Sequence, residues 1–591
     1  MVDVSGEGGH RAAARLTEEA GSRAAMPERA AAHCGLAGSA DGASGGGGEA
    51  PAATFRPRDA RSERRLVTTI ALLSFAYVFF FRHYTTLDPD EGIILQGAQR
   101  ILQGEVLYRD FFSFFTPGSY YFVALLFKLF GSSILVARSA LAVYGSAFAV
   151  LTYLLARRVC SGWASVCAAV LAAVISIPYR VLVVHNWDST FWACLALYCA
   201  LRSLESGHWF WAGGLGCTSA LTILFEQSKG GGLVLGLAVA YLLITLTEQG
   251  RVLLRRGWWL ALAVGAALPI SVTVIYFAGR HALGPMLDGV LWPLFHYSAA
   301  NQVPYGYQNW SESARASLFL RASWGERVVA LLVLIPCFIV PVLPLVAAGF
   351  LVYWCLPGRK PRERSHVRHY YILTGSVLTG LLLSVVVVRA DIVHFMYLAP
   401  LLFLVLAWIM DGGDIHSSVY RAVRPWLNCL ILSSFAAFAL ALFLRTTDAP
   451  YRIESRRGVL LAPQPDTVVA YVQAHAAPGE KILVYPYLPL YYYLTATMSP
   501  IRYEYLQPGL HSLAQVHEAM AQLAANPPRA VLLEMNFNEK IATSWPHTAL
   551  QFVAGDPLES QLLRDYRACA VLHSPNGWRF LYMTPKGEVC P

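Results

Sequence analysis

Apolar blocks separated by short polar segments recur along the chain from residue 66 to residue 444. A helix needs about 20 apolar residues to cross the hydrocarbon core of a bilayer, and most of these blocks reach or approach that length. The pattern therefore predicts a polytopic α-helical membrane protein. We expect about eleven spans, at residues 66–81, 134–155, 163–178, 187–204, 209–225, 230–247, 258–277, 328–354, 370–389, 394–410 and 426–444.

The composition agrees with this pattern. Of the 591 residues, 56% are hydrophobic and 14% are charged, whereas soluble domains carry about a quarter charged residues. A soluble globular enzyme is therefore excluded. The net charge of +9 would suit a nucleic-acid partner, but the basic residues lie mostly in short loops between apolar blocks. We expect the lipid bilayer as a partner and no nucleic acid.

The basic loops also predict an orientation, because cytoplasmic loops hold an excess of Lys and Arg. Threading the spans from a cytoplasmic N-terminus puts these loops on the cytoplasmic side and leaves the alternate loops poor in basic residues. We expect a multi-pass inner or plasma membrane protein with its C-terminal end outside the cytoplasm. The cytoplasmic basic residues would be Arg157, Arg158, Arg251, Arg255, Arg256, the run 358–369, Arg421 and Arg424.

Three regions follow from the composition. Residues 1–65 form a predicted cytoplasmic tail, in which the Ala- and Gly-rich stretch up to about residue 55 is expected to be disordered. Residues 66–445 form the transmembrane region. Residues 446–591 have the balanced charge of a water-soluble domain, with strand-like runs at 481–487, 529–535 and 578–584 and a helical pattern between the first two. They predict a small extracytoplasmic α/β domain, in which Cys569 and Cys590 form either a disulfide or two free thiols.

Two external loops, 82–133 and 278–327, are too long to be simple connectors. In the first, Ile94, Leu95, Ala98, Ile101 and Leu102 recur at helical spacing opposite a polar side, which predicts an amphipathic helix on the membrane surface. A second helical pattern runs from Thr116-Pro117 to Gly131 and is too short to span. We expect two interfacial helices lying over the bundle.

The candidate chemistry starts in the same loop, where Asp88, Asp90 and Glu91 stand together at the external membrane boundary. Acids there also serve as helix N-caps, so this cluster alone supports a structural role and a functional role equally. Arg138, about a turn inside the second span, either snorkels to the lipid head groups or meets an anion. More charged side chains stand at the same level: His185, Asp188, Glu226, Lys229, Arg389, Asp391 and His394.

With these residues the sequence resembles the GT-C superfamily, the multi-span glycosyltransferases that use polyprenyl-phosphate sugars. The likeness is greatest to the protein O-mannosyltransferases, the aminoarabinose transferases of lipid A and the rhizobial lipopolysaccharide core transferases. It covers about residues 66–445, and the C-terminal domain also looks like theirs. It rests on Asp90-Glu91-Gly92, Leu102 to Gly104, Tyr108 to Phe111, Pro117-Gly118 with Tyr120-Tyr121, Phe130-Gly131 and Arg138, and more weakly on Asp188, Lys229 and residues 391–400.

The resemblance implies a sugar transfer with inversion, in which Asp90 is the catalytic base and Glu91 orients the acceptor or supports the base. A polyprenyl phosphate leaves as a stable anion, so the enzyme has mainly to deprotonate the acceptor hydroxyl and stabilise phosphate charge. The candidates for binding the donor phosphate are Arg138, Lys229, Arg389 and His394. The candidates for binding the sugar or the acceptor are Asp88, Arg109, Asp110, His185 and Asp188.

Three alternatives stay open. Asp88-Pro89-Asp90 has the spacing of a DxD motif, so Mg²⁺ or Mn²⁺ is an alternative to a reaction without a cofactor. Where the aminoarabinose transferases carry a Glu-Lys pair, this chain has Phe114-Phe115, which argues against lipid A and leaves a glycan, another lipid or a protein as acceptor. A transporter or flippase of lipid-linked sugars is the alternative function, although we find no internal repeat. A structural or sensory protein would leave the acidic loop unexplained.

Overall fold

The helices of the computed structural model follow the apolar blocks. The structure describes residues 59–246, 256–296, 301–310, 312–355, 365–413, 415, 417–508, 510–546 and 555–591. Residues 1–58 of the predicted tail lie outside this part, whereas residues 60–65 are helical and extend the first span. Glu63 explains the extension, because it accepts a hydrogen bond from Tyr153 at 2.7 Å and pairs with Arg157 at 3.8 Å.

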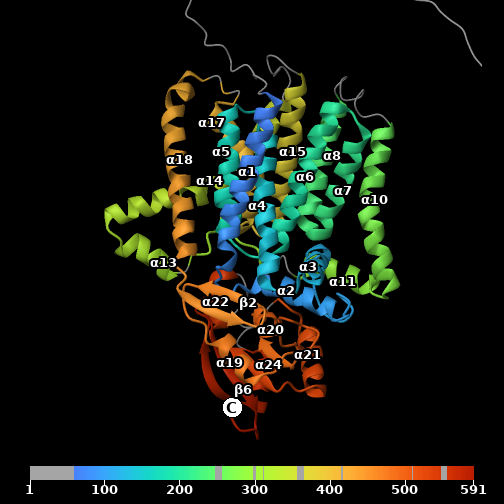
Figure 1. Ribbon diagram of the computed structural model, residues 1–591, viewed down its shortest axis with the longest axis vertical. Helices are drawn as coiled ribbons and strands as arrows, with labels where there is room; N and C mark the ends of the chain where they lie inside the picture. Colours follow the sequence, from blue (N-terminus) through green and yellow to red (C-terminus); the bar gives the residue numbers. More distant parts are fainter. Residues whose placement is uncertain are drawn as a thin grey trace, which may run out of the picture. The chain divides into compact units, whose positions relative to one another are not determined.

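Ten of the predicted spans each follow one helix, whereas the span predicted at 394–410 is divided between α16 (Ile392–Tyr397) and α17 (Figure 1). Eight of the described helices are long and apolar enough to cross a membrane. Of the other three, α7 and α17 are short and α6 carries polar residues, among them Asp188 and Arg202. The helices are α1 (Ala60–Phe80), α4 (Ile134–Ala156), α5 (Gly162–Tyr179), α6 (His185–Ser206), α7 (Trp209–Phe225), α8 (Gln227–Thr245), α10 (Arg256–Gly279), α14 (Trp324–Cys355), α15 (Ser365–Val388), α17 (Ala399–Asp411) and α18 (Ser418–Thr447).

Small residues allow the closest helix contacts. A Cβ atom on Gly380 of α15 would lie 2.1 Å from the carbonyl oxygen of Gly232 in α8, and one on Gly265 of α10 would lie 2.0 Å from that of Gly213 in α7. Backbones approach this closely only where side chains are absent, as is common between helices in lipid. Glycine residues therefore allow the close backbone packing of α8 against α15 and of α7 against α10.

The first loop forms the two predicted helices, α2 (Pro89–Leu102) and α3 (Gly118–Phe130), after the short η1 (Phe81–His83). Asp88 caps α2 by accepting a hydrogen bond from the Asp90 N–H at 3.1 Å, and Pro89 occupies the first helical position. The polar side of α2 differs from the prediction. Gln96 and Arg100 are buried because the C-terminal domain covers them, so this side faces protein and not the membrane surface.

The C-terminal region forms the predicted small α/β domain. A four-stranded sheet has the order β3-β4-β6-β5, in which β3 and β4 are parallel and the other pairs antiparallel. The three predicted strands correspond to β3, β4 and β6 and the predicted helix to α21. A disulfide joins Cys569 and Cys590. The elements are β1 (Tyr451–Ser455), β2 (Gly458–Ala462), α19 (Val468–His475), β3 (Ile482–Tyr485), α20 (Leu490–Thr495), α21 (Leu513–Ala525), β4 (Ala530–Glu534), α22 (Phe537–Ser544), α24 (Pro557–Asp565), β5 (Tyr566–His573) and β6 (Arg579–Pro585).

The C-terminal domain is attached to the first loop by main-chain contacts. The Thr85 N–H donates to the Leu461 carbonyl at 2.8 Å, and the Asn576 side chain donates to the Leu87 carbonyl at 2.9 Å. Figure 1 shows the domain at one end of the helices, beside α2. The second long loop contributes α11 (Leu283–Phe295), α13 (Glu312–Ala316) and η2 (Ser317–Arg321), and α16 (Ile392–Tyr397) precedes α17. Of these elements, α11 and α16 line the site described next.

Candidate active site

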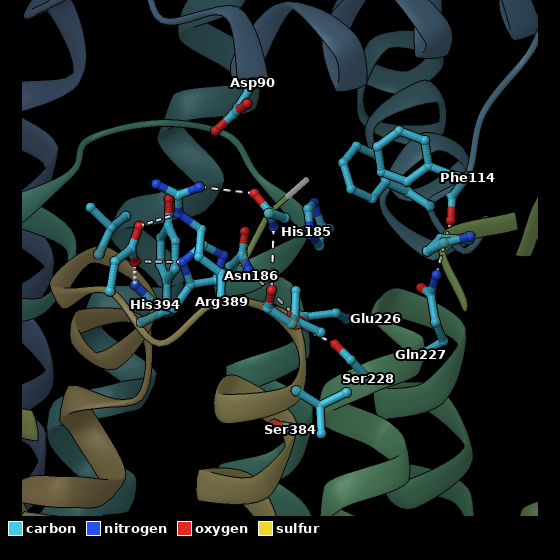
Figure 2. Close-up of a pocket in the computed structure, with 18 of the residues that line it drawn as sticks. Asp90, Phe114, His185, Asn186, Glu226, Gln227, Ser228, Ser384, Arg389 and His394 are labelled. Carbon is cyan, nitrogen blue, oxygen red and sulfur yellow. Dashed lines mark hydrogen bonds and ion pairs between the residues drawn. The ribbon is translucent and has the colours of Figure 1, made fainter. Parts of the chain in front are cut away.

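A cavity of about 870 Å³ lies between the C-terminal domain and the ends of the helices that face it (Figure 2). One part of its wall is apolar and comes from α8, α11 and α15. The rest is polar and comes from the start of α2, the loop after α5, the segment around α16 and the C-terminal domain. The apolar lining residues include Leu235, Val290, Leu291, Leu294, Leu383, Val387 and Val388.

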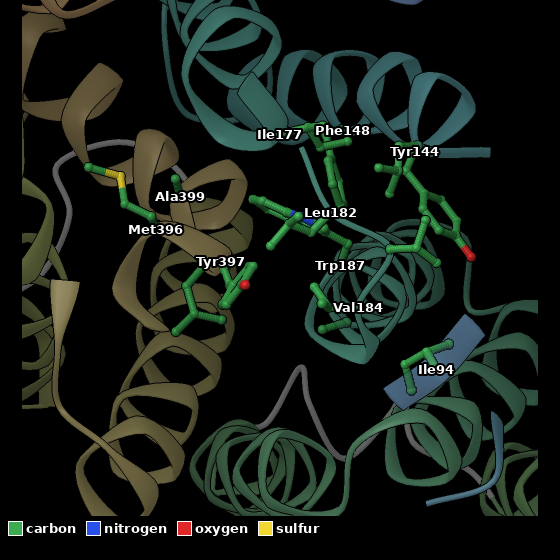
Figure 3. Close-up of a cluster of buried hydrophobic side chains, with 14 of the residues drawn as sticks. Ile94, Tyr144, Phe148, Ile177, Leu182, Val184, Trp187, Met396, Tyr397 and Ala399 are labelled. Atoms are coloured by element: carbon green, nitrogen blue, oxygen red, sulfur yellow. The ribbon is translucent and has the colours of Figure 1, made fainter. Parts of the chain in front are cut away.

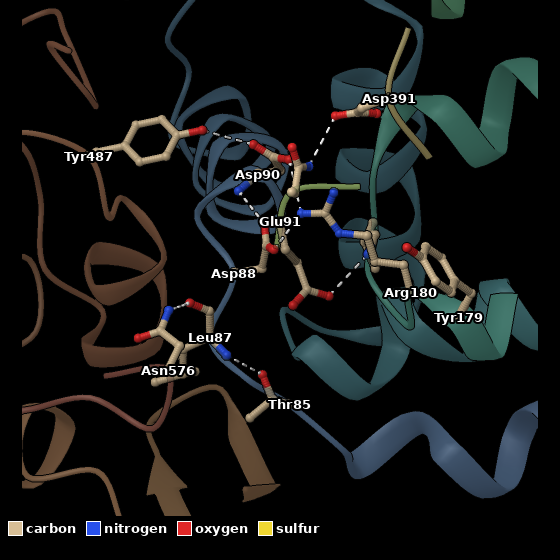
Figure 4. Close-up of polar contacts among 12 residues, drawn as sticks. Thr85, Leu87, Asp88, Asp90, Glu91, Tyr179, Arg180, Asp391, Tyr487 and Asn576 are labelled. Atoms are coloured by element: carbon tan, nitrogen blue, oxygen red, sulfur yellow. Dashed lines mark hydrogen bonds and ion pairs between the residues drawn. The ribbon is translucent and has the colours of Figure 1, made fainter. Parts of the chain in front are cut away.

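Asp90 lies at the polar part of the cavity, and its side chain is 38% exposed to it. Its Oδ1 accepts a hydrogen bond from the Tyr487 hydroxyl at 3.1 Å, and its Oδ2 lies 3.3 Å from Nη2 of Arg180 (Figure 4). Burial raises the pKa of Asp90, and the Asp88 charge raises it further, while Arg180, Tyr487 and His394 act in the opposite direction. A carboxylate with a raised pKa is a stronger base than one in water.

Arg180 is a site residue that the sequence analysis did not single out. It pairs with both Asp88 and Asp90 and lines the cavity. Its backbone is held by Trp187, whose indole N–H donates to the Arg180 carbonyl at 3.1 Å. Trp187 is itself fully buried between Phe148 and Tyr397, with ring centroids 5.9 and 4.8 Å away (Figure 3). A packed apolar cluster therefore fixes the guanidinium next to the acids.

A second charged group at the cavity consists of Arg389, Asp391 and His394. Arg389 Nε lies 2.5 Å from one Asp391 oxygen, and His394 Nδ1 lies 2.6 Å from the other. Although burial opposes it, these two neighbours lower the pKa of Asp391 below its ordinary value. Arg389 also donates to Asn301 at 2.9 Å and to the Ser544 carbonyl. Arg389 and His394, both candidates for binding the donor phosphate, line the cavity.

Glu91 and Arg138 lie elsewhere. Both side chains are fully buried and form a two-pronged ion pair, with 2.8 Å between Arg138 Nε and Oε1 and 2.5 Å between Nη2 and Oε2. Arg138 also donates to the Tyr84 carbonyl, and Glu91 accepts from the Val183 N–H at 3.1 Å. Neither is among the described residues that line the cavity. This geometry supports a role in holding α2 to α4 and gives no direct contact with donor or acceptor.

Lys229 is also buried beneath the cavity surface. Its ammonium pairs with Glu226 at 2.9 Å and donates to Ser189 Oγ at 2.8 Å and to the Asn186 carbonyl at 2.9 Å. Glu226 and Asn186 line the cavity, whereas Lys229 does not. Lys229 therefore contacts two residues of the cavity wall without lining the cavity itself.

The predicted sugar- and acceptor-binding residues separate into two sets. Asp88 and His185 line the cavity, and the rings of His185 and Phe115 are in tilted contact with their centroids 4.2 Å apart. Asp188 is buried and accepts from Ser119 Oγ at 2.5 Å. Arg109 and Asp110 pair with each other at 2.8 Å away from the cavity, and Arg109 donates to the Arg280 carbonyl.

The C-terminal domain contributes cavity residues that the sequence analysis did not predict. They are Tyr487, Lys540, Ser544, Trp545, Asn576 and Trp578. Tyr487 is the one that contacts Asp90. The run KILVYPY predicts only a strand, and nothing in its spacing indicates that its last residue, Tyr487, reaches a carboxylate 397 positions away.

The sequence was also compared with known proteins. The family model of dolichyl-phosphate-mannose-protein mannosyltransferase matches residues 116–277. Asp90 precedes this match. No curated protein matches the sequence.

Among solved structures, the chain is similar to ArnT from Cupriavidus metallidurans bound to undecaprenyl phosphate, at 13% identity and a TM-score of 0.48, over 90% of this chain and 100% of that one. It is also similar to the Archaeoglobus fulgidus oligosaccharyltransferase tethered with an acceptor peptide, at 11% identity and a TM-score of 0.48, over 89% of this chain and 75% of that one.

Proposed function

We propose that this chain is a glycosyltransferase of the GT-C superfamily that moves a sugar from a polyprenyl-phosphate donor to a hydroxyl group of a cell-envelope glycan, lipid or protein. The match of residues 116–277 to the family model of dolichyl-phosphate-mannose-protein mannosyltransferase supports this proposal. We propose Asp90 as the base of an inverting transfer on the extracytoplasmic face. The substrate class is the one that this superfamily implies, and the position of Asp90 in the wall of the cavity supports its assignment as the base.

The observation that carries the proposal is the division of the cavity into an apolar and a polar part. A polyprenyl-phosphate sugar has the same division, since a hydrocarbon chain joins a charged phosphate and a polar sugar. The apolar wall from α8, α11 and α15 suits the hydrocarbon chain. The phosphate would then lie among Arg180, Arg389 and His394, with the sugar beside Asp90.

The proposed reaction needs one proton transfer. Asp90 removes the proton from the acceptor hydroxyl while the oxygen attacks the anomeric carbon of the sugar. The bond between that carbon and the phosphate oxygen breaks, and polyprenyl phosphate leaves with its electron pair. The leaving group gains negative charge, which Arg180, Arg389 and His394 stabilise. A separate general acid is unnecessary, because phosphate is a good leaving group at neutral pH.

The carboxylates of Asp88 and Asp90 do not fit a binding site for a divalent cation. Arg180 already pairs with both carboxylates, so its positive charge occupies the place that Mg²⁺ or Mn²⁺ would take. Within the described ranges, no three His, Cys, Asp or Glu side chains are grouped to hold a metal ion. We therefore propose Arg180 as the cation of this site, and no step of the proposed transfer uses a metal.

The orientation is part of the proposal. The basic loops support a cytoplasmic N-terminal side, and the cavity lies at the end of the helices that would then face outward. The disulfide between Cys569 and Cys590 supports an oxidising compartment for the C-terminal domain.

Replacement of Asp90 tests the proposal. Membranes that contain the protein would be incubated with a panel of radiolabelled polyprenyl-phosphate sugars and with envelope material from a strain that lacks the gene. We expect Asp90→Asn to lower transfer of the accepted sugar by at least about 100-fold, because a positioned base contributes that much or more. Mass spectrometry of the envelope with and without the gene would name the product.

Asp288→Asn is the matched control. Asp288 is an exposed carboxylate on α11 that is not part of the cavity lining, so this variant removes the same charge and should transfer at the parental rate. Transfer at the parental rate by Asp90→Asn, with normal membrane insertion, would show that Asp90 is not the base. Movement of the lipid-linked sugar across proteoliposomes without any transfer would favour a flippase.

A further inference from the structure

Tyr487 brings a side chain of the C-terminal domain to the proposed base. It lies between β3 and α20, and its hydroxyl donates to Asp90 Oδ1 at 3.1 Å (Figure 4). Arg180 approaches the other oxygen, Oδ2, at 3.3 Å. The two oxygens of Asp90 are thus held from opposite parts of the molecule, one by the bundle and one by the C-terminal domain.

The main chain at Tyr487 is itself held by a hydrogen bond. Its N–H donates to Glu534 Oε1 at 3.1 Å. Glu534 ends β4, the parallel neighbour of β3, so the two strand ends bring this carboxyl group to the loop that carries Tyr487. Glu534 is 4% exposed, and burial raises its pKa to about 8.

Ring contacts hold the Tyr487 side chain in the cavity wall. Its ring meets Trp545 edge-on at 5.4 Å and Tyr505 at 6.1 Å between centroids. Trp545 in turn donates to Asn301 at 3.0 Å, the same side chain that accepts from Arg389. Tyr487 therefore belongs to a connected set of contacts that runs from Asp90 to the second charged group of the cavity.

We propose that Tyr487 is a positioning residue for Asp90, and that Glu534 holds the loop that carries Tyr487 in place. The inference rests on the proposed function, because it assigns Tyr487 a task only if Asp90 is the base. A carboxylate held on one oxygen by a fixed hydroxyl presents its remaining lone pairs in one direction, toward the acceptor. Loss of this hydrogen bond lets the carboxylate rotate, which lowers the rate of proton removal without changing how the donor binds.

The charged and titratable groups that face Asp90 come from four places. Asp88 precedes it on the cap of α2, Arg180 comes from the loop after α5, His394 and Tyr397 from α16 and Tyr487 from the C-terminal domain. The Tyr487 hydrogen bond favours the charged form of Asp90, so its removal raises the pKa of Asp90. The acidic limb of the pH–rate profile must then move to higher pH.

The experiment uses the full-length protein and the donor that the panel above identifies. For Tyr487→Phe we expect kcat to fall by between about 10- and 100-fold, the KM for the donor to stay within about twofold, and the acidic limb to move to higher pH. Tyr451→Phe is the matched control, because Tyr451 is an exposed residue of β1, 46% accessible. It should leave all three quantities unchanged.

Two variants of Glu534 separate positioning from general stability. Glu534→Gln keeps an acceptor oxygen and should retain near-parental kcat, whereas Glu534→Leu loses the acceptor and should behave as Tyr487→Phe does. Parental kcat and an unmoved pH profile for Tyr487→Phe, with Asp90→Asn inactive, would overturn this inference and leave the proposed function intact. An active Asp90→Asn variant would remove the basis of both.

Discussion

At the level of single residues, the cavity brings acids and cations together in matched groups. Asp90 shares Arg180 with Asp88, and Asp391 shares its two oxygens between Arg389 and His394. Each cation is held by an acid, so its position is fixed before a substrate enters. Pre-organised charges of this kind stabilise a developing phosphate anion without reorganising during the reaction.

Removal of the Asp88 charge and removal of the Arg180 charge should move the pH dependence of kcat/KM in opposite directions. The Asp88 charge raises the pKa of Asp90 and the Arg180 charge lowers it. Asp88→Asn, which can still cap α2, should therefore move the acidic limb of kcat/KM to lower pH, and Arg180→Gln should move it to higher pH. Initial rates between about pH 4.5 and 8 would measure both shifts. Shifts of the same sign would contradict the proposed arrangement of charges.

Neighbouring positions in the sequence indicated only in part which residues face the cavity. Asp90 and Glu91 were predicted together, yet the structure turns only Asp90 toward the cavity. Consecutive helical residues point about 100° apart, so neighbours in one helix often face different surroundings. Arg180 was not predicted because a single arginine in a short loop carries no pattern. What makes it a site residue is its distance to Asp88 and Asp90.

At the level of elements, periodicity and capping were sufficient to predict α2 and α3 but not what covers them. Of the predicted apolar side of α2, Ile94, Leu95 and Ala98 are buried, whereas Ile101 is half-buried and Leu102 is exposed. Its polar side was expected at the membrane surface, but Arg100 lies there 3.7 Å from Glu504, a buried acid of the C-terminal domain. The covering domain starts more than 300 residues later in the sequence, so no local pattern reveals it.

A substitution of Gly92 tests how closely α2 packs against the C-terminal domain. A Cβ atom at this position would lie 2.2 Å from the backbone nitrogen of Leu490 in α20. Although alanine is the better helix former, Gly92→Ala should lower the free energy of unfolding by about 1–3 kcal/mol, since overpacking forces the backbone to shift. Thermal unfolding of the purified protein would measure it. Gly349→Ala is the control, because a Cβ atom on Gly349 in α14 has no neighbour within 4 Å. Equal melting temperatures for both variants would contradict this packing.

At the level of the whole molecule, the cavity depends on elements from both ends of the chain. The bundle supplies the apolar wall and most charged groups, and the C-terminal domain supplies Tyr487, Lys540 and Trp545. Hydrogen bonds from Thr85 and Asn576 join the two parts next to Asp90. The C-terminal domain is therefore a part of the site and not an appendage.

Thiol labelling tests the orientation of the whole molecule. If the C-terminal domain faces the oxidising side, a membrane-impermeant maleimide applied to intact cells should label Cys569 and Cys590 only after reduction of their disulfide. The double variant Cys569→Ser/Cys590→Ser should lose this reduction-dependent label. Labelling that requires disruption of the membrane would place the domain in the cytoplasm and contradict the proposed topology.

The sequence by itself determined the elements, because each depends on a local pattern. Hydrophobic length predicted the membrane helices, helical spacing and capping residues predicted α2 and α3, and strand-like runs predicted β3, β4 and β6 but not β1, β2 or β5. The concentration of acids at residues 88–91 indicated where the chemistry lies. Only the tertiary structure decided which of those acids faces the cavity, which cations accompany it and that a tyrosine 397 residues away contacts it. These are distances between separate elements, and they depend on how the helices and the C-terminal domain pack together.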